Sequence, residues 1–354
     1  MTNSSPSQNA PNTGFHLGRQ PALDGIRGFA VLAVLAQHLK LPYSTHGALG
    51  VDVFFTLSGF LITVLLVEEW CQNGRIHLGH FYMRRVLRLY PALLLMLLIV
   101  SFFSPARGYI VSALTYSTNW VIALKILPLN LELGHTWTLA IEEQYYLLWP
   151  LTLSILLKWL SPRKVVFVPL VLGLVSAIWR IILWQSTHDF WRYNAGTDSH
   201  ADGLLLGSTL GLIIGFGIVS INSSWKQIIK ISAYVLIAFT LILLMFFPRP
   251  DGFIASIGIP LIVLSTLLLI ILLVGFRVSW LHKLLSNPLI SLPGVISYGL
   301  YLWQVPVINL LHLDRIGLTQ TQSAVVLTIL IFLICLLSYR YLEKPVLRLK
   351  RFFN

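Results

Sequence analysis

Three side chains that can carry charge or move a proton lie in the apolar stretch of residues 23–38: Asp24, Arg27 and His38. An α-helix turns by about 100° per residue, so the three project within about 60° of one another. The eleven positions between Arg27 and His38 correspond to roughly 16 Å along a helix. A histidine can act as a general base near neutral pH, and a cation can stabilise an oxyanion. The spacing predicts a polar track along one helix face, with a base at its far end.

The alternative for this stretch is structural. Asp24 and Arg27 are one turn apart and could form an ion pair, while His38 could donate a hydrogen bond to a neighbouring helix. Ionisable residues inside apolar helices usually face a cavity or a partner, because an exposed charge there costs at least about 2.5–3.5 kcal/mol. We therefore favour a functional role for the three residues.

Two glutamates, Glu142 and Glu143, interrupt a later apolar stretch. A carboxylate at membrane depth is costly unless it is paired, protonated or facing water. The two side chains point about 100° apart on a helix, and Glu142 shares its side with the polar residues Thr138 and Tyr145. We favour Glu142 for orienting a substrate, pairing with Arg27 or holding an imidazole. A structural hydrogen bond between helices is the alternative.

Three arginines, Arg84, Arg85 and Arg88, precede the apolar run that starts near Leu89. Clustered guanidinium groups bind phosphates well. Arg85 and Arg88 are three positions apart and share a helix face, so they are better candidates than Arg84. Basic residues at this place also serve to orient a membrane helix, which is the competing explanation.

The composition indicates a membrane protein. Of 354 residues, 56% are hydrophobic and only 11% are charged, with a mean hydropathy of +0.79, which is unusual for a water-soluble domain. A helix needs about 20 apolar residues to cross the hydrocarbon core, and we predict about ten such segments. They begin near Ala22, Gly50, Leu89, Trp137, Val165, Asp202, Ile231, Phe253, Leu292 and Ser323. The predicted fold is an all-α polytopic helix bundle.

Charge in the loops predicts the orientation. Lys and Arg are concentrated in alternate loops, as in residues 158–164 and 344–351, and such loops face the cytoplasm. Both termini are then cytoplasmic. We expect a disordered tail at 1–20, one membrane domain at 21–348 and a basic tail at 349–354. Residues 104–137 are too polar to span.

Several function classes are disfavoured. The net charge is +12, but no consecutive basic block typical of nucleic-acid binding is present. Cys71 and Cys335 lack the spacing of a disulfide framework or a thiolate metal site. His200 and Asp202 are two positions apart and do not share a helix face, so we expect no metal there.

The residues singled out above resemble those of the acyltransferase-3 family of integral membrane acyltransferases. The arginine and histidine eleven positions apart are similar to those of its first helix. Further similar stretches are GVDVFFTLSGFLIT (residues 50–63), FYMRRVLRLYPAL with its two spaced arginines, HTWTLAIEEQYYLLWP (residues 135–150), ISYGLYLWQVPV and the final EKPV. Five motifs in the right order over nearly the whole chain make the resemblance specific.

The resemblance implies transfer of an acyl group, often acetyl, from a coenzyme A thioester on the cytoplasmic side to a hydroxyl of a carbohydrate or glycan. Acyl-CoA is then the donor substrate, with no permanently bound cofactor. The partners are the glycan acceptor and the lipid bilayer, with no nucleic acid, and a bacterial cytoplasmic membrane is the expected location. Because we see no fused soluble hydrolase-like domain, the membrane domain is expected to complete the transfer itself.

The predicted site combines the residue analysis with the resemblance. His38 corresponds to the family's essential histidine and Arg27 to its essential arginine, with Asp24 and Glu142 beside them. The predicted residues of the donor site are Arg27, Arg85, Arg88, Ser58 and Gly59. The predicted residues of the acceptor or cavity site are Glu143, Asp202, Tyr298, Tyr301 and Gln304. Many relatives have histidine where Gln304 stands and arginine where His200 stands, so only hydrogen bonding is expected of Gln304.

A transporter is the alternative from another class. A carrier or exporter of a polysaccharide or lipid-linked precursor could use the same buried charges as a substrate or proton pathway. An exporter has no need for a phosphate clamp at Arg85 and Arg88, and this favours the enzyme.

Overall fold

The structure is a computed structural model that describes residues 16–104, 106–220, 222–246, 251–311 and 317–353. Across these ranges the chain forms helices and turns and contains no strand. The all-α prediction is therefore confirmed.

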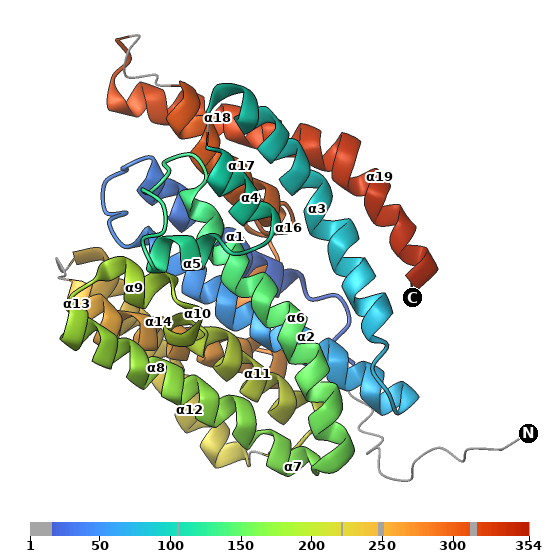
Figure 1. Ribbon diagram of the computed structural model, residues 1–354. Helices are drawn as coiled ribbons and strands as arrows, with labels where there is room; N and C mark the ends of the chain where they lie inside the picture. Colours follow the sequence, from blue (N-terminus) through green and yellow to red (C-terminus); the bar gives the residue numbers. More distant parts are fainter. Residues whose placement is uncertain (1–15, 105, 221, 247–250, 312–316, 354) are drawn as a thin grey trace, which may run out of the picture.

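Three helices occupy the middle of the molecule (Figure 1): α1 (Pro21–His38), α2 (Gly50–Asn73) and α6 (Trp137–Trp159). The fourth central helix, α11 (Asp202–Gly215), packs along α2. Glycines allow this close approach, because a Cβ at Gly59 would stand 1.9 Å from the carbonyl oxygen of Leu204, and one at Gly207 would stand 2.1 Å from that of Thr56. The α2–α11 contact is thus set by backbone touching backbone.

Other helices lie on two sides of this centre (Figure 1). On one side are α3 (Leu78–Phe103), α17 (Ser297–Leu311), α18 (Gln320–Ser338), the π-helix η6 (Tyr339–Glu343), α19 (Lys344–Leu347) and the 3₁₀-helix η7 (Arg348–Phe353). On the other are α8 (Phe167–Thr187), α12 (Ser223–Phe246), the π-helix η3 (Ile254–Gly258), α14 (Ile259–Ile270) and the π-helix η4 (Ile271–Gly275). Short helices connect them: η1 (Gly47–Leu49), α4 (Arg107–Leu114), α5 (Thr118–Ala123), η2 (Gly134–Thr136), α7 (Pro162–Val165), α9 (Phe190–Ala195), α10 (Thr197–His200), α13 (Asp251–Phe253), α15 (Ser279–Leu285) and α16 (Pro288–Val295).

Six helices of the described chain are long and apolar enough to cross a membrane, and a seventh span is formed if α16 and α17, bent by 72°, are taken together. This supports a multi-pass membrane protein, although the ten predicted spans are not all of this kind. α11 has only 14 residues, and α1 and α6 each carry buried or half-buried charges. Between Ser104 and Trp137 the described residues form only short helices, as the polar composition predicts.

The ends of the bundle differ from the predicted tails. Residues 1–15 of the predicted N-terminal tail lie outside the described residues. The next residues are held against α2, where the backbone N–H of Leu17 donates to Glu68 at 2.5 Å. At the other end η7 packs on α3, and Arg84 donates to the carbonyl of Phe353 at 2.6 Å. The segment predicted as a basic tail is therefore helical and packed as far as Phe353.

One boundary prediction is wrong in a way that affects the site. α3 begins at Leu78 rather than near Leu89, so Arg84, Arg85 and Arg88 lie within the helix and not before it. The side chains can reach the helix end through their long aliphatic stems, which is why three charges are compatible with this position.

A candidate acyl-transfer site

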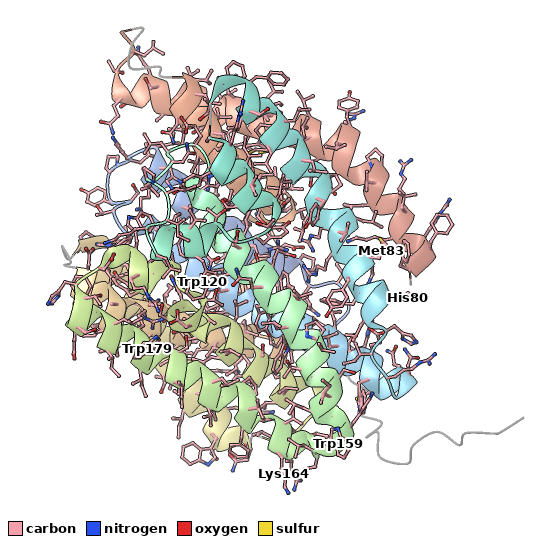
Figure 2. The ribbon with its side chains drawn as sticks, in the orientation of Figure 1. His80, Met83, Trp120, Trp159, Lys164 and Trp179 are labelled. Carbon is pink, nitrogen blue, oxygen red and sulfur yellow. The ribbon has the colours of Figure 1, made fainter. Side chains whose placement is uncertain are left out.

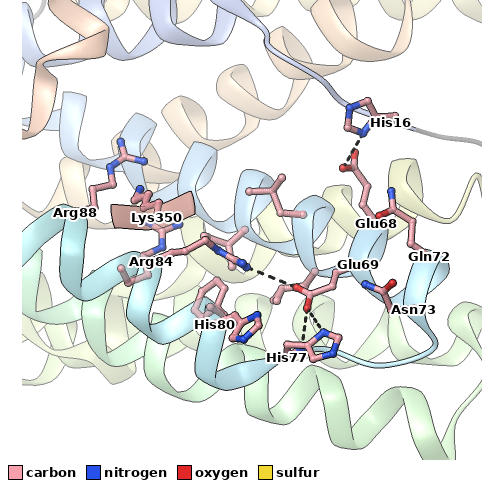
Figure 3. Close-up of a pocket in the computed structure, with 15 residues that line it drawn as sticks. His16, Glu68, Glu69, Gln72, Asn73, His77, His80, Arg84, Arg88 and Lys350 are labelled. Carbon is pink, nitrogen blue, oxygen red and sulfur yellow. Dashed lines mark hydrogen bonds and ion pairs between the residues drawn. The ribbon is translucent and has the colours of Figure 1, made fainter. Parts of the chain in front are cut away.

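A basic cavity of about 680 Å³ opens where α2 ends and α3 begins. Arg84, Arg85, Arg88 and Lys350 supply its positive charge (Figure 3). Glu69 lies opposite, where it accepts from His77 at 2.9 Å and stands 3.7 Å from Arg84. Four cations in one cavity make it suited to a ligand with several phosphates.

Two narrow cavities lie next to the basic one between the central helices, and each shares lining residues with its neighbour. The first, of about 60 Å³, shares Arg85 and Arg88 with the basic cavity and is also lined by Arg27 and Glu142. The second, of about 50 Å³, shares Arg27 and Glu142 with the first and adds Tyr301. Each has room for only a few water molecules.

A wider cavity of about 450 Å³ lies at the opposite end of α1 and α2. It shares Val51 and Tyr301 with the second narrow cavity, and His38 lines it. Its walls carry aromatic rings and side-chain amides: Trp137, Phe190, Trp191 and Tyr301, and Gln37, Asn130, Asn194 and Asn309. We call it the outer cavity. Shared residues thus link four cavities from one end of α1 to the other.

Arg27 and His38 occupy this path as the helix spacing predicts. Arg27 lines both narrow cavities, and its guanidinium carbon is 5.9 Å from the centre of the Phe54 ring. No ion pair joins it to Asp24 in the described structure. Asp24 itself does not line any of the four cavities. The structure therefore does not contain the Asp24–Arg27 ion pair that was the structural alternative for this stretch.

The His38 ring has an unusual environment. Its Nδ1 is buried without a hydrogen-bond partner among the described residues, and so are Oε1 and Nε2 of Gln304. The Gln304 side chain is fully buried. Unpaired polar atoms at this depth are costly unless a ligand or water completes them. Gln304 lines none of the four cavities, but His38 lines the outer cavity, so its unpaired nitrogen marks that part of the wall as a place for a polar reactant.

Glu142 lines both narrow cavities, whereas Glu143 is not among the residues lining any of the four. Ser58 and Tyr146 both donate hydrogen bonds to Oε1 of Glu142. Arg85 lies over the Tyr146 ring, 4.2 Å from its centre. These contacts orient Glu142 on the basic side of the path, next to Arg27.

The remaining predicted residues separate into two groups. Ser58, Tyr298 and Tyr301 line the cavities; Tyr298 donates to the carbonyl of Leu89 at 2.8 Å, and Tyr301 donates to that of His135 at 3.0 Å. Gly59 packs against α11 and does not face the path. Asp202 is held by Arg180 through two hydrogen bonds of 2.6 and 2.9 Å and is also off the path.

The sequence did not reveal that His200 and Asp52 form a buried pair at the outer cavity. Nε2 of His200 lies 2.8 Å from Oδ1 of Asp52, and both residues line the cavity. Asp52 stands in the quoted stretch of residues 50–63, but its partner is 148 positions away. The one available signal was an acidic residue in an apolar helix start.

Comparison with known proteins decides the family. The family model described as an acyltransferase domain matches residues 20–340. The chain belongs to this acyltransferase domain family. The predicted family and the prediction of an enzyme that transfers acyl groups are confirmed. No solved structure matches the chain.

Relatives of this acyltransferase domain include two curated bacterial proteins. One is the peptidoglycan O-acetyltransferase OatA of Listeria monocytogenes, 34% identical over 346 residues, which cover 92% of this chain and 55% of that protein. The other is the O-acetyltransferase OatA of Staphylococcus aureus strain NCTC 8325, 32% identical over 343 residues, with 92% and 57% covered. The chain therefore spans little more than half the length of these relatives.

Proposed function

We propose that this acyltransferase domain moves an acetyl group from acetyl-coenzyme A, bound at the cytoplasmic end, to a hydroxyl of a glycan at the opposite face of a bacterial cytoplasmic membrane. The observation that carries the proposal is the series of linked cavities, with phosphate-binding chemistry at one end and His38 at the other. Peptidoglycan is the proposed acceptor because it is named for the relative from Listeria monocytogenes.

The basic cavity is proposed to hold the nucleotide end of the donor. Arg85, Arg88 and Lys350 supply charge to its phosphates. The thin pantetheine arm is then proposed to extend past Arg27 and Glu142 along the narrow cavities, which must widen to admit it but by less than a sugar ring would require. This size difference favours acyl transfer over glycan export, because an exporter must pass the glycan itself.

The outer cavity is proposed to hold the acceptor. Aromatic faces such as Trp137 and Trp191 stack on the apolar faces of sugar rings, while amides such as Asn130 and Asn194 pair with hydroxyls. Such a mixture of rings and uncharged polar groups suits a carbohydrate better than a peptide or a lipid tail.

The proposed chemistry takes place at His38. Its imidazole removes the proton from the acceptor hydroxyl, and the oxygen attacks the thioester carbonyl carbon. Breakage of the C–S bond releases the thiolate of coenzyme A, which takes the proton back from the imidazolium. The products are the acetyl ester and free coenzyme A.

Purified protein in lipid nanodiscs, given labelled acetyl-coenzyme A and peptidoglycan fragments, tests this function. We expect acceptor-dependent release of coenzyme A and label on the glycan, falling by roughly 10²–10⁴-fold in His38→Ala because a general base is lost. His282→Ala, whose ring lies outside the four cavities, is the matched control and should retain activity. Undiminished turnover in folded His38→Ala, or glycan movement without thioester consumption, contradicts the proposal.

A further inference from the structure

His200 ends α10 at the wall of the outer cavity and bonds on both sides of its ring. Nε2 is 2.8 Å from Oδ1 of Asp52 on α2, and Nδ1 is 2.5 Å from the backbone carbonyl oxygen of Asn194 at α9. The side chain is only 3% exposed. The ring therefore joins two elements that are far apart in the sequence.

The partners determine the protonation state of this ring. A carbonyl oxygen and a carboxylate oxygen both accept hydrogen bonds, so both ring nitrogens must carry a proton. A carboxyl group ordinarily gives up its proton near pH 4 and an imidazolium near pH 6.5, so the shared proton belongs to the ring. The geometry thus requires His200 to be an imidazolium.

Neighbouring charges support the same state. Arg180 on α8 and Asp202 on α11 form a second buried pair with an N–O distance of 2.6 Å, and the four groups are each at most 3% exposed. With His200 charged, the group has two positive and two negative charges. A neutral His200 would leave one negative charge uncompensated in a buried region, which is costly.

The pKa of His200 follows from these neighbours. Burial opposes the charged ring, but the Asp52 carboxylate more than offsets it and raises the pKa above its ordinary value. Arg180 lowers it and Asp202 raises it by smaller amounts. Further titratable groups on the cavity wall are His38, His46, His135, Asp251 and Tyr301.

The ring also holds an aromatic wall in place. Trp137 lies against it, with ring centres 5.6 Å apart, and Phe55 contacts it edge-on at the same separation. Loss of the proton removes one of the two hydrogen bonds, because a neutral imidazole has a single N–H. Asn194 and Trp137, which line the cavity beside His200, then lose their fixed positions relative to α2.

We propose that His200 is a positioning residue, an imidazolium fixed between Asp52 and Asn194, that shapes the acceptor side of the site and whose loss of a proton ends acyl transfer at high pH. The part concerning transfer rests on the proposed function. Activity and folding should both weaken as the pH rises through the pKa of His200 in the folded protein. The stabilising contribution is complete below the ordinary pKa of an unfolded histidine.

Two substitutions test the role of the charge. His200→Gln is neutral, and we expect it to lower kcat/KM for the acceptor by roughly tenfold at pH 6.5, the effect of losing a charge-assisted hydrogen bond, with donor affinity within twofold of wild type. His200→Arg keeps a permanent cation with several donors, so it should rescue activity relative to His200→Gln and remove the fall at high pH. An unchanged alkaline limb in His200→Arg would assign that limb to another group and overturn the proposal.

A measurement without substrate separates this proposal from the proposed function. The melting temperature of the protein in nanodiscs is recorded from pH 6 to 10 for wild type and His200→Arg. We expect the wild type to lose stability with rising pH more steeply than the variant. Parallel curves would refute the imidazolium, whatever the activity. If the curves diverge but the protein shows no acyl transfer, the charged His200 is supported and the proposed function is rejected.

Discussion

At the residue scale, the site depends on a contrast between paired and unpaired charges. Asp202 and Arg180 satisfy each other, and Glu142 accepts from Ser58 and Tyr146. Arg27, by contrast, faces the narrow cavities with no ion pair in the described structure. A half-buried cation without a counter-ion attracts a polar or anionic ligand. The unpaired groups therefore mark where substrate is expected to bind.

The double substitution Arg85→Ala with Arg88→Ala tests the donor end at this scale. Each charge-assisted hydrogen bond contributes about 1.5–3 kcal/mol, so we expect affinity for coenzyme A to fall by roughly tenfold or more, with acceptor affinity little changed. Calorimetric titration of coenzyme A measures the first quantity. Lys164→Ala, an exposed cation beyond the four cavities, is the control (Figure 2). Equal donor affinities in the double variant and the control would exclude the arginines from phosphate binding.

Some residues that line the candidate site could be singled out from the sequence and others could not. Arg27, His38 and Glu142 are charged or titratable groups within apolar helices, and their energetic cost alone draws attention to them. His200 could not be assigned in this way, since its role depends on Asp52, a partner that only the packing of α10 against α2 brings near. Neither composition nor helical periodicity gives the distance between His200 and Asp52.

At the scale of elements, the contact between α2 and α11 fixes the position of a helix that lines the path. Ser58 faces the first narrow cavity, while the adjacent Gly59 faces α11. The same turn of α2 therefore packs against α11 and places a polar group in the cavity wall. A side chain at Gly59 would push the two helices apart and shift Ser58 with them.

Gly59→Val is the corresponding test. Its added atoms would overlap the Leu204 carbonyl, and overpacking of this kind costs about 1–3 kcal/mol. We expect a lower melting temperature in detergent and reduced acyl transfer. Gly79→Val, where an added Cβ meets nothing within 4 Å, serves as the control. If Gly59→Val melts at the same temperature as Gly79→Val, the α2–α11 contact is not set by glycine.

Helix boundaries were predictable where a polar loop passes directly into an apolar run. Helices begin at Gly50, Trp137 and Asp202, where spans were predicted to start, although only the first of these helices is long and apolar enough to cross a membrane. α3 begins eleven residues earlier than predicted because its arginines, treated as loop charges, are accommodated inside a helix. The bend between α16 and α17 was not predicted, since an apolar sequence can continue through a change in helix direction.

At the scale of the whole molecule, the ends of the bundle differ in chemistry. Arg84, Arg85, Arg88 and Lys350 gather at one end, and the aromatic and amide walls lie at the other. Figure 2 shows Trp159 and Lys164 at the end where α6 passes into α7. Because basic residues tend to face the cytoplasm in membrane proteins, we predict that this end is cytoplasmic, and the proposed direction of transfer rests on that prediction.

Cysteine labelling tests this orientation. In a protein with Cys71 and Cys335 replaced by alanine, single cysteines are placed at Pro42 and at Lys164, both exposed. A maleimide that cannot cross membranes should label Pro42→Cys in intact cells, and Lys164→Cys only after permeabilisation. The reverse pattern would invert the molecule and place the basic cavity outside.

The small size of the two middle cavities has a consequence for the cell. A wide aqueous passage between two compartments would let sodium ions and protons leak down their gradients, whereas spaces of about 50 and 60 Å³ admit neither a hydrated ion stream nor a sugar. If an acetyl group crosses here on a slender arm, the membrane keeps its electrical insulation during every turnover. Export of the modification then needs no gate that alternates between open and closed.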